Sequence, residues 1–325
     1  MNFLKVFWMG IWKMIYGVRS LFRRSKSRES QARKVVLKGR HAQMLAAARK
    51  GNIEAQIDLA TCYSDGDGVE QDYSQAAHWF GEAARLGDPR GQFSFGICHA
   101  NGQGVAQDYE EAAQFFRLAA EQGNVGAQVS LGLCLQKGLG AYPSPKEAVE
   151  WFRKAAERGD AAGQVSLASC LQTGQGVEKG EAEAVQWFRK AAEQGLAEAE
   201  YNLGKCYQAG AGVPTDDVEA CKWYRLAAQK GLPQAEFDLA LCCRQGRGTA
   251  VDLIEAYTWM SLAARRSIPN SSETAEELKK ELSSEQLAEA DRRIAGLVPS
   301  RPTVAPPTSE DLDLEDEVEA KFPTT

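Results

Sequence analysis

Apolar residues recur with helical spacing through the middle of the chain. Within residues 123–158, the first group shares one side of a helix because its members are four, three and one residues apart: Ala127, Leu131, Cys134 and Leu135. This spacing predicts a helix over residues 125–137 that ends at Gly138 and Gly140, since glycine tolerates the positive φ that closes a helix and turns the chain. A second stripe ends before Gly159 and consists of Ala148, Trp151, Phe152, Ala155 and Ala156. The segment is therefore predicted to form an αα-hairpin.

The hairpin pattern is repeated six times with a period of 36 residues and no insertion. Steps of 36 residues connect Gly51, Gly87, Gly123, Gly159, Gly195 and Gly231. The same step connects the aromatic residues Trp79, Phe115, Trp151, Trp187, Trp223 and Trp259. One hairpin cannot bury both of its apolar stripes, so neighbouring hairpins must stack. The pattern predicts an all-α fold, an α-solenoid.

Two stretches resemble a known family. Residues 197–231 (AEAEYNLGKCYQAGAGVPTDDVEACKWYRLAAQKG) and 148–159 (AVEWFRKAAERG) are similar to Sel1-like repeats, which are relatives of the tetratricopeptide repeat with a longer inter-helix loop. The resemblance extends from Gly51 to about Arg266. It implies a superhelical scaffold that binds proteins or peptides, with no chemistry and no cofactor, and the C-terminal LSSEQLAEADRRIAG (residues 282–296) is similar to the tail of many bacterial members.

In each predicted first helix, a small polar residue directly precedes the leucine or phenylalanine that recurs every 36 residues. It consists of Asp58, Ser94, Ser130, Ser166, Asn202 and Asp238. In tetratricopeptide-like stacks the first helices line the concave face, and the resemblance places this row there. Such donors and acceptors would bond an extended peptide backbone. The alternative is a solvated helix position with no ligand.

The N-terminal part of the chain is basic and the rest is acidic, although the net charge of the whole chain is only −6. Residues 1–50 contain thirteen Lys or Arg and one Glu (+12), whereas residues 51–297 sum to −13 and residues 298–325 to −5. The acidic repeats exclude nucleic acid as the expected partner. We expect a monomer whose partner is a protein or peptide.

The first 22 residues contain no acid and form an amphipathic pattern. The apolar side includes Phe3, Leu4, Phe7, Trp8, Ile11 and Ile15, and a basic cluster with Arg23 and Arg24 follows. Its longest uncharged run is seven residues, far below the ~20 that cross a bilayer. We therefore expect a helix in the plane of an anionic membrane surface, anchored by the basic cluster. The alternatives are a cleaved targeting or export segment, which would leave a soluble adaptor, and an unstructured basic arm.

Basic residues on the C-terminal side of this segment favour a cytoplasmic position for the repeats. Six of the eight cysteines fall once per repeat on the buried stripe, with no CxxC pair, which predicts reduced thiols that act as small apolar residues. Together these features predict a membrane-associated protein of the cytoplasm. An exported or organelle-targeted protein is the alternative.

No chemical site emerges from the sequence. The three histidines, His41, His78 and His99, occupy different repeat positions, and no nucleophile–base pair stands outside the repeat register. We therefore expect no catalytic, metal or cofactor residues. The competing hypothesis is a hydrolase of cell-wall-related or β-lactam compounds, an activity linked to some family members.

These observations divide the chain into five parts. Residues 1–28 are the amphipathic basic segment, and residues 35–50 are an N-terminal capping helix. The six repeats are 51–86, 87–122, 123–158, 159–194, 195–230 and 231–266. Residues 267–298 are C-terminal capping helices, each opened by a capping box, Asn270 to Glu273 and Ser283 to Gln286. Residues 299–325 are a Pro-rich and acidic tail, expected to be disordered when free.

Overall fold

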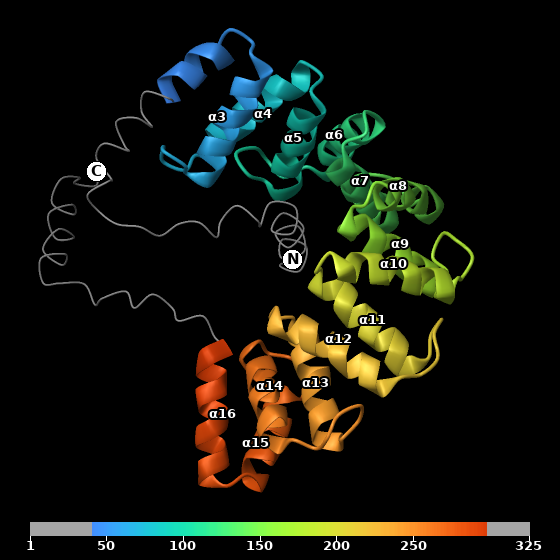
Figure 1. Ribbon diagram of the computed structural model, residues 1–325. Helices are drawn as coiled ribbons and strands as arrows, with labels where there is room; N and C mark the ends of the chain where they lie inside the picture. The colour runs from blue at the N-terminus through green and yellow to red at the C-terminus, as the bar shows by residue number, and fades with distance from the viewer. Residues whose placement is uncertain (1–40, 298–325) are drawn as a thin grey trace, which may run out of the picture. The chain divides into compact units, whose positions relative to one another are not determined.

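The computed structural model describes residues 41–297 (Figure 1). Every element in this range is a helix, which confirms the predicted all-α class. The predictions for residues 1–28 and for the tail 299–325 lie outside the described residues. Residues 41–48 are helical and precede the first repeat.

Each repeat consists of two helices of thirteen residues. The first helices are α3 (Ile53–Asp65), α5 (Pro89–Asn101), α7 (Val125–Lys137), α9 (Ala161–Thr173), α11 (Ala197–Ala209) and α13 (Pro233–Gln245). The second helices are α4 (Tyr73–Arg85), α6 (Tyr109–Glu121), α8 (Pro145–Glu157), α10 (Glu181–Glu193), α12 (Asp217–Gln229) and α14 (Leu253–Arg265). The predicted helix over residues 125–137 is therefore confirmed by α7.

Two glycines end each first helix and turn the chain. Gly138 has φ 68° and its N–H donates to the Cys134 carbonyl, so the left-handed residue caps α7. Gly140, at φ 66°, has a second reason to be glycine: a Cβ built there would lie 1.8 Å from the carbonyl oxygen of Tyr109. Tyr109 begins α6 of the preceding repeat, so this loop closes directly on its neighbour's backbone. The equivalent close approaches are Gly104 to Tyr73, Gly176 to Pro145 and Gly212 to Glu181.

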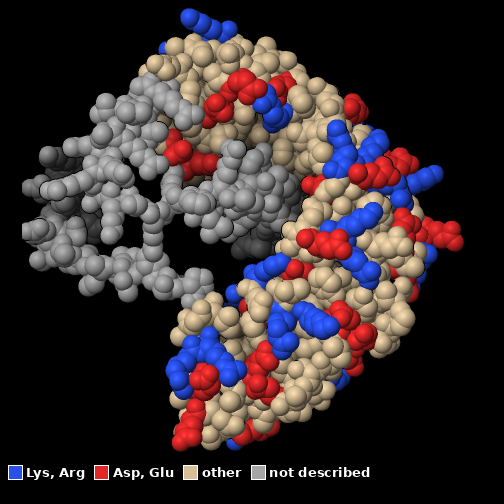
Figure 2. All heavy atoms as spheres, viewed as in Figure 1, with Lys and Arg blue, Asp and Glu red and all other residues tan. Residues whose placement is uncertain are grey.

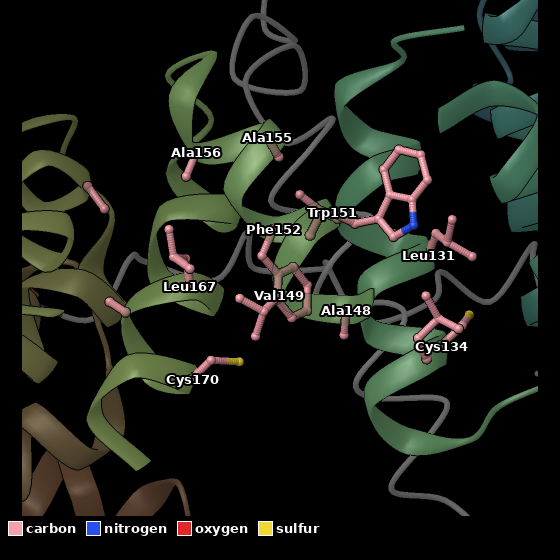
Figure 3. Packing of buried hydrophobic residues seen from close by; sticks show 14 of the residues in the cluster. Leu131, Cys134, Ala148, Val149, Trp151, Phe152, Ala155, Ala156, Leu167 and Cys170 are labelled. Carbon is pink, nitrogen blue, oxygen red and sulfur yellow. The ribbon is translucent and has the colours of Figure 1, made fainter. Parts of the chain in front are cut away.

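The core lies between the helices of successive hairpins. In Figure 3, Phe152 and Val149 of α8 lie between Leu131 of α7 and Leu167 of α9. Phe152 has no exposed surface, whereas Trp151 lies at the edge of the core with 8% of its surface exposed. The second aromatic residue is likewise completely buried at Phe116, Phe188 and Tyr224, although sequence reasoning gave both residues of a pair the same role.

Small residues make room for these buried rings. A Cβ at Gly132 of α7 would lie 2.5 Å from the Phe152 ring, and the same contact joins Gly96 to Phe116. Glycine costs helix stability, by roughly 1 kcal/mol relative to alanine. Here it permits a ring to lie directly against the helix backbone within one hairpin.

The chain divides into two compact units after Ala227. In the first unit the second helices α4, α6, α8 and α10 each pack on the first helix of the next repeat. In the second unit, α15 (Ser271–Glu281) and α16 (Ser284–Leu297) both pack on α14.

One predicted capping box is confirmed and the other is wrong. The backbone N–H of Ser283 donates to Gln286 Oε1 at 2.9 Å, and the N–H of Gln286 donates to Ser283 Oγ at 3.3 Å. Asn270 instead adopts the left-handed conformation, with φ 64°, and its side chain accepts no capping bond. A cap needs extended backbone to aim its side chain at the first turn, which Asn270 lacks.

Candidate functional site

The predicted peptide-binding row does not have one uniform environment. Asp58 is exposed, whereas Ser166, Asn202 and Asp238 are half-buried. Ser94 and Ser130 are buried, and the Ser130 hydroxyl has no hydrogen-bond partner. A solvated helix position therefore does not describe the whole row.

A second row, one residue earlier in each first helix, runs beside the polar one. It consists of apolar or aromatic residues in every repeat: Ile57, Phe93, Val129, Val165, Tyr201 and Phe237. Phe93 and Val129 are buried and the other four are half-buried. We call the surface that the members of these two rows on α3 to α11 form within the first unit the first-helix face. Its polar and apolar rows combine the two kinds of contact that a bound peptide needs: backbone hydrogen bonds and side-chain burial.

Two pairs of neighbouring first helices in the first unit contact each other, α7 with α9 and α9 with α11. The Gln136 amide nitrogen donates to Gln175 Oε1 at 2.8 Å and lies 3.5 Å from the sulfur of Cys170. Gln172 lies in the same way 3.6 Å from the sulfur of Cys206.

A row of buried amides and carboxyls, missed by sequence reasoning, lies near the start of the first helices, and three of its glutamines donate to the helix that precedes them. The row is Gln56, Gln92, Gln128, Gln164, Glu200 and Glu236. The Gln128 amide donates to the Ala120 carbonyl at 3.3 Å, and Gln164 donates to Ala156 at the same distance. These carbonyls lie in the last turn of the preceding second helix, where backbone acceptors have no partner within the helix. These six positions are 36 residues apart in the sequence, and this spacing could have identified the row.

Glutamate replaces glutamine in the last two members of this row, Glu200 and Glu236, and the surroundings of Glu236 differ accordingly. Glu236 is buried, and Arg266 lies 3.4 Å from its carboxylate. Burial raises the pKa of Glu236, while Arg266 opposes that shift. In two earlier repeats the residue thirty positions later is glutamine instead, and Gln122 donates to Gln92 at 2.8 Å. The Gln92–Gln122 amide pair and the Glu236–Arg266 ion pair therefore occupy equivalent positions in their repeats.

On the second helices, Arg and Glu link neighbouring repeats beside the core tryptophans. Arg117 of α6 donates to Glu147 of α8 at 2.7 Å, and this hydrogen bond is the main cause that lowers the pKa of Glu147. Glu147 also accepts from the Trp151 indole at 3.4 Å, and the Lys154 ammonium lies 3.8 Å from the Trp151 ring centre. Because both members of the ion pair are over a third exposed, it is worth about 0–1 kcal/mol. Its main effect is to position the indole.

The first repeat has a strongly acidic stretch next to the first-helix face. Residues 53–72, which include α3 and the following turn, contain six Asp or Glu and no Lys or Arg. Asp58 and Glu70 are exposed, whereas Glu54 pairs with Arg90 at 2.8 Å and Asp72 caps α4. Figure 2 shows acidic side chains over this end of the first unit. A basic ligand would therefore be attracted to the first repeat.

The described residues contain no group of three or more His, Cys, Asp or Glu side chains that could hold a metal ion. The eight cysteines all lie within residues 41–297, and all except Cys62 are buried. Burial raises the pKa of Cys98 and of Cys134 to about 12, so neither thiol is a nucleophile at neutral pH. The cysteines pack as apolar residues in the described core.

Comparison with known proteins identifies the repeat. The Sel1 repeat family model matches residues 53–88, 89–124, 125–160, 161–196, 197–232 and 233–267. The chain belongs to the Sel1 repeat family. The matched segments have the predicted period of about 36 residues and begin two residues later than the predicted repeats.

Two solved structures of Sel1-type repeats resemble this chain. A Sel1 repeat protein from Oxalobacter formigenes is 32% identical with a TM-score of 0.63, over 67% of this chain and 89% of that one. A protective antigen of uropathogenic Escherichia coli strains, which displays an SLR fold, is 29% identical with a TM-score of 0.53, over 83% of this chain and 68% of that one. A comparison with curated proteins gives no significant match. Sel1 repeat proteins are generally scaffolds for protein–protein interaction.

The membrane-contact residues predicted from the sequence, from Phe3 to Arg24, lie outside the described residues. Over residues 41–297, no helix combines the length and apolar character needed to cross a bilayer.

Proposed function

We propose that this Sel1 repeat protein is a non-enzymatic scaffold that binds an extended protein or peptide segment on its first-helix face. The observation that supports this most directly is the pairing of a polar row with an apolar row along successive first helices. Ser166 and Asn202 are half-buried members of the polar row and keep surface that a ligand can contact, whereas Ser130 has none.

We further propose that the N-terminal segment attaches the scaffold to the cytoplasmic surface of an anionic membrane. Support comes from the acid-free amphipathic sequence and the basic cluster behind it. The charge difference between residues 1–50 and the acidic repeats also favours this arrangement, because the repeats themselves would be repelled by anionic lipid.

A comparison of bait variants tests the binding face. The full chain is used as bait beside a Ser166→Arg/Asn202→Arg variant, which blocks the polar row, and a Glu121→Arg/Glu193→Arg variant, which alters two exposed residues of second helices. We expect one set of proteins to bind the wild type and the second-helix variant but to be lost from the first-helix variant. Equal retention by both variants would refute this binding face.

Sedimentation with vesicles tests the membrane attachment. We expect the full chain to sediment with phosphatidylglycerol-containing vesicles and to be released as salt increases. Replacement of Arg23, Arg24, Lys26 and Arg28 by glutamine should weaken binding at least tenfold, because each charge contributes about 1 kcal/mol. Equal binding to neutral and anionic vesicles would contradict the proposed electrostatic anchor.

A further inference from the structure

We propose that the basic cluster of residues 19–28 binds to the loop edge of the first three repeats of its own chain. The loop edge consists of Tyr73, Tyr109 and the turns 66–72, 102–108 and 138–144, which connect the two helices of each repeat. The contact requires neither a membrane nor a bound peptide, so it goes beyond the proposed function. While it lasts, the cluster is withheld from other anionic surfaces.

Tyrosine rings are exposed along this edge. Tyr73 keeps 36% of its surface exposed and Tyr142 keeps 94%, while Tyr109 is half-buried. The Gln71 amide donates to the Tyr73 hydroxyl at 3.0 Å and so holds this ring in place. Gln107 donates in the same way to the Tyr109 hydroxyl at 2.9 Å. Rings presented in this manner attract Arg and Lys, because an aromatic face stabilises a cation.

The three turns form one continuous edge. Gly104 of the second turn closely approaches the backbone of Tyr73, and Gly140 of the third turn closely approaches that of Tyr109. Tyr142 follows Gly140 by two residues in the third turn. The four later repeats replace the tyrosine that opens the second helix by Pro145, Glu181, Asp217 and Leu253. The pair of ordered tyrosines therefore belongs to the first two repeats.

The same edge is acidic where these two tyrosines lie. Residues 66–75 and 102–111 each contain three Asp or Glu and no Lys or Arg. Glu70 and Glu110 are exposed. The basic cluster contains no acid and five cations, which are Arg19, Arg23, Arg24, Lys26 and Arg28. Because carboxylates and aromatic rings both stabilise Arg and Lys, the edge complements this cluster rather than the acidic tail.

The chain before residue 41 joins the described structure at this edge. His41, the first described residue, packs edge-to-face on Tyr63, with the ring centroids 5.3 Å apart. Tyr63 lies in the last turn of α3, and its carbonyl accepts from the Asp72 N–H at 2.9 Å. Residues 29–40 can span up to about 40 Å. Packed helices lie about 8–10 Å apart, so the cluster can reach all three turns.

Photo-crosslinking in the full chain tests this contact. A benzoylphenylalanine in place of Tyr142 keeps an aromatic ring on the edge and puts the probe beside the bound cluster. The matched control carries the same probe at Leu86, which is 51% exposed and follows α4. Because α4 begins at Tyr73 and has thirteen residues, Leu86 lies about 20 Å from the loop edge. Labelled and unlabelled chains are mixed so that mass spectrometry distinguishes crosslinks within a chain from those between copies.

At low salt, we expect crosslinks from position 142 to residues 19–34 of the same chain, at least fivefold above the Leu86 control. They should fall at least threefold at about 1 M salt, where the Debye length is about 3 Å. Their absence at low salt, or crosslinks only between copies, would overturn the proposal. Crosslinks to residues 1–18 or to the acidic tail would overturn it in favour of another occupant. No lipid or partner is present, so failure here is distinct from failure of membrane attachment or peptide binding.

A charge exchange gives a second test. Glu70→Lys/Glu110→Lys should reduce the crosslink at least threefold, because both exposed carboxylates would become cations that repel the cluster. Arg23→Glu/Arg24→Glu in that background should restore it, since the charges are then opposite again. Failure of this restoration would overturn the pairing of the cluster with the edge.

The control for the charge exchange is Glu121→Lys/Glu157→Lys. Both residues are exposed and end α6 and α8, so they lie at the other end of the second helices from the loop edge. This variant changes the net charge by the same amount and should leave the crosslink unchanged. Equal loss in the two lysine variants would show a general charge effect and overturn the assignment to the loop edge.

Discussion

The close approach of Gly140 to the preceding repeat makes a sharp prediction about stability. Alanine at this position would adopt a left-handed conformation, which costs roughly 1–2 kcal/mol. Its Cβ would also lie 1.8 Å from the Tyr109 carbonyl oxygen and 2.1 Å from the carbonyl carbon, so the loop must move away from its neighbour. Overpacking of this kind costs about 1–3 kcal/mol. We expect Gly140→Ala to lower the free energy of unfolding by about 2–5 kcal/mol.

Gly159 provides the matched control for this substitution. It has φ 88°, yet a Cβ built there has no atom within 4 Å. Gly159→Ala therefore carries the backbone cost alone, about 1–2 kcal/mol. The difference between the two variants isolates the contact between repeats.

Urea unfolding followed by circular dichroism measures both variants. With a slope of about 3 kcal/mol/M, the Gly140 variant should unfold at a urea concentration lower by about 0.7–1.7 M, and the Gly159 variant by about 0.3–0.7 M. A stack of repeats can lose its ends first, so the slopes must be compared as well. If Gly140→Ala is no more destabilising than Gly159→Ala, the close approach does not contribute as argued.

Three further predictions follow from the core. Phe152→Ala and Trp151→Ala should each cost about 3–5 kcal/mol in urea unfolding, with Phe152 the larger because it is completely buried; the reverse order would contradict the burial described here. Native protein should react slowly with a thiol reagent, with Cys62 first, and all eight thiols should react in denaturant without reductant; stable disulfides would refute this. Burial raises the pKa of Glu236, so the folded state binds this proton more tightly than the unfolded state, and the free energy of unfolding should fall as pH rises above about 4.5. Glu236→Gln should remove this contribution to the pH dependence. A variant with the same pH profile as the wild type would refute the prediction.

Much of the fold could be predicted because one period determines it. The residues of α7 were obtained from apolar spacing and from Gly138, since both are local properties of the sequence. The role of Gly140 could not be obtained in the same way, because its cause is a carbonyl in the preceding repeat. At Asn270 a local sequence pattern gave a wrong prediction. The residues fit a capping box, but the left-handed backbone of Asn270 prevents its side chain from capping the helix.

The candidate site was predicted less completely. The register alone identified the polar row from Asp58 to Asp238, but it gave no sign that Ser130 is buried and Asp58 exposed. The buried row that includes Gln128 was overlooked because a lone glutamine on a helix usually faces solvent. Its acceptor, the Ala120 carbonyl, becomes available only when two hairpins stack.

The links between neighbouring repeats have a consequence for how such a chain can change in length. The pair Arg117–Glu147 joins residues 30 positions apart, and Gln136–Gln175 joins residues 39 positions apart. Each link therefore depends on the adjacent copy and on nothing farther along the chain. Duplication of one whole 36-residue unit would give every new side chain an equivalent partner, whereas gain or loss of a few residues would shift all later partners out of register. Recombination between copies can thus lengthen or shorten the first-helix face in whole steps while the protein remains folded.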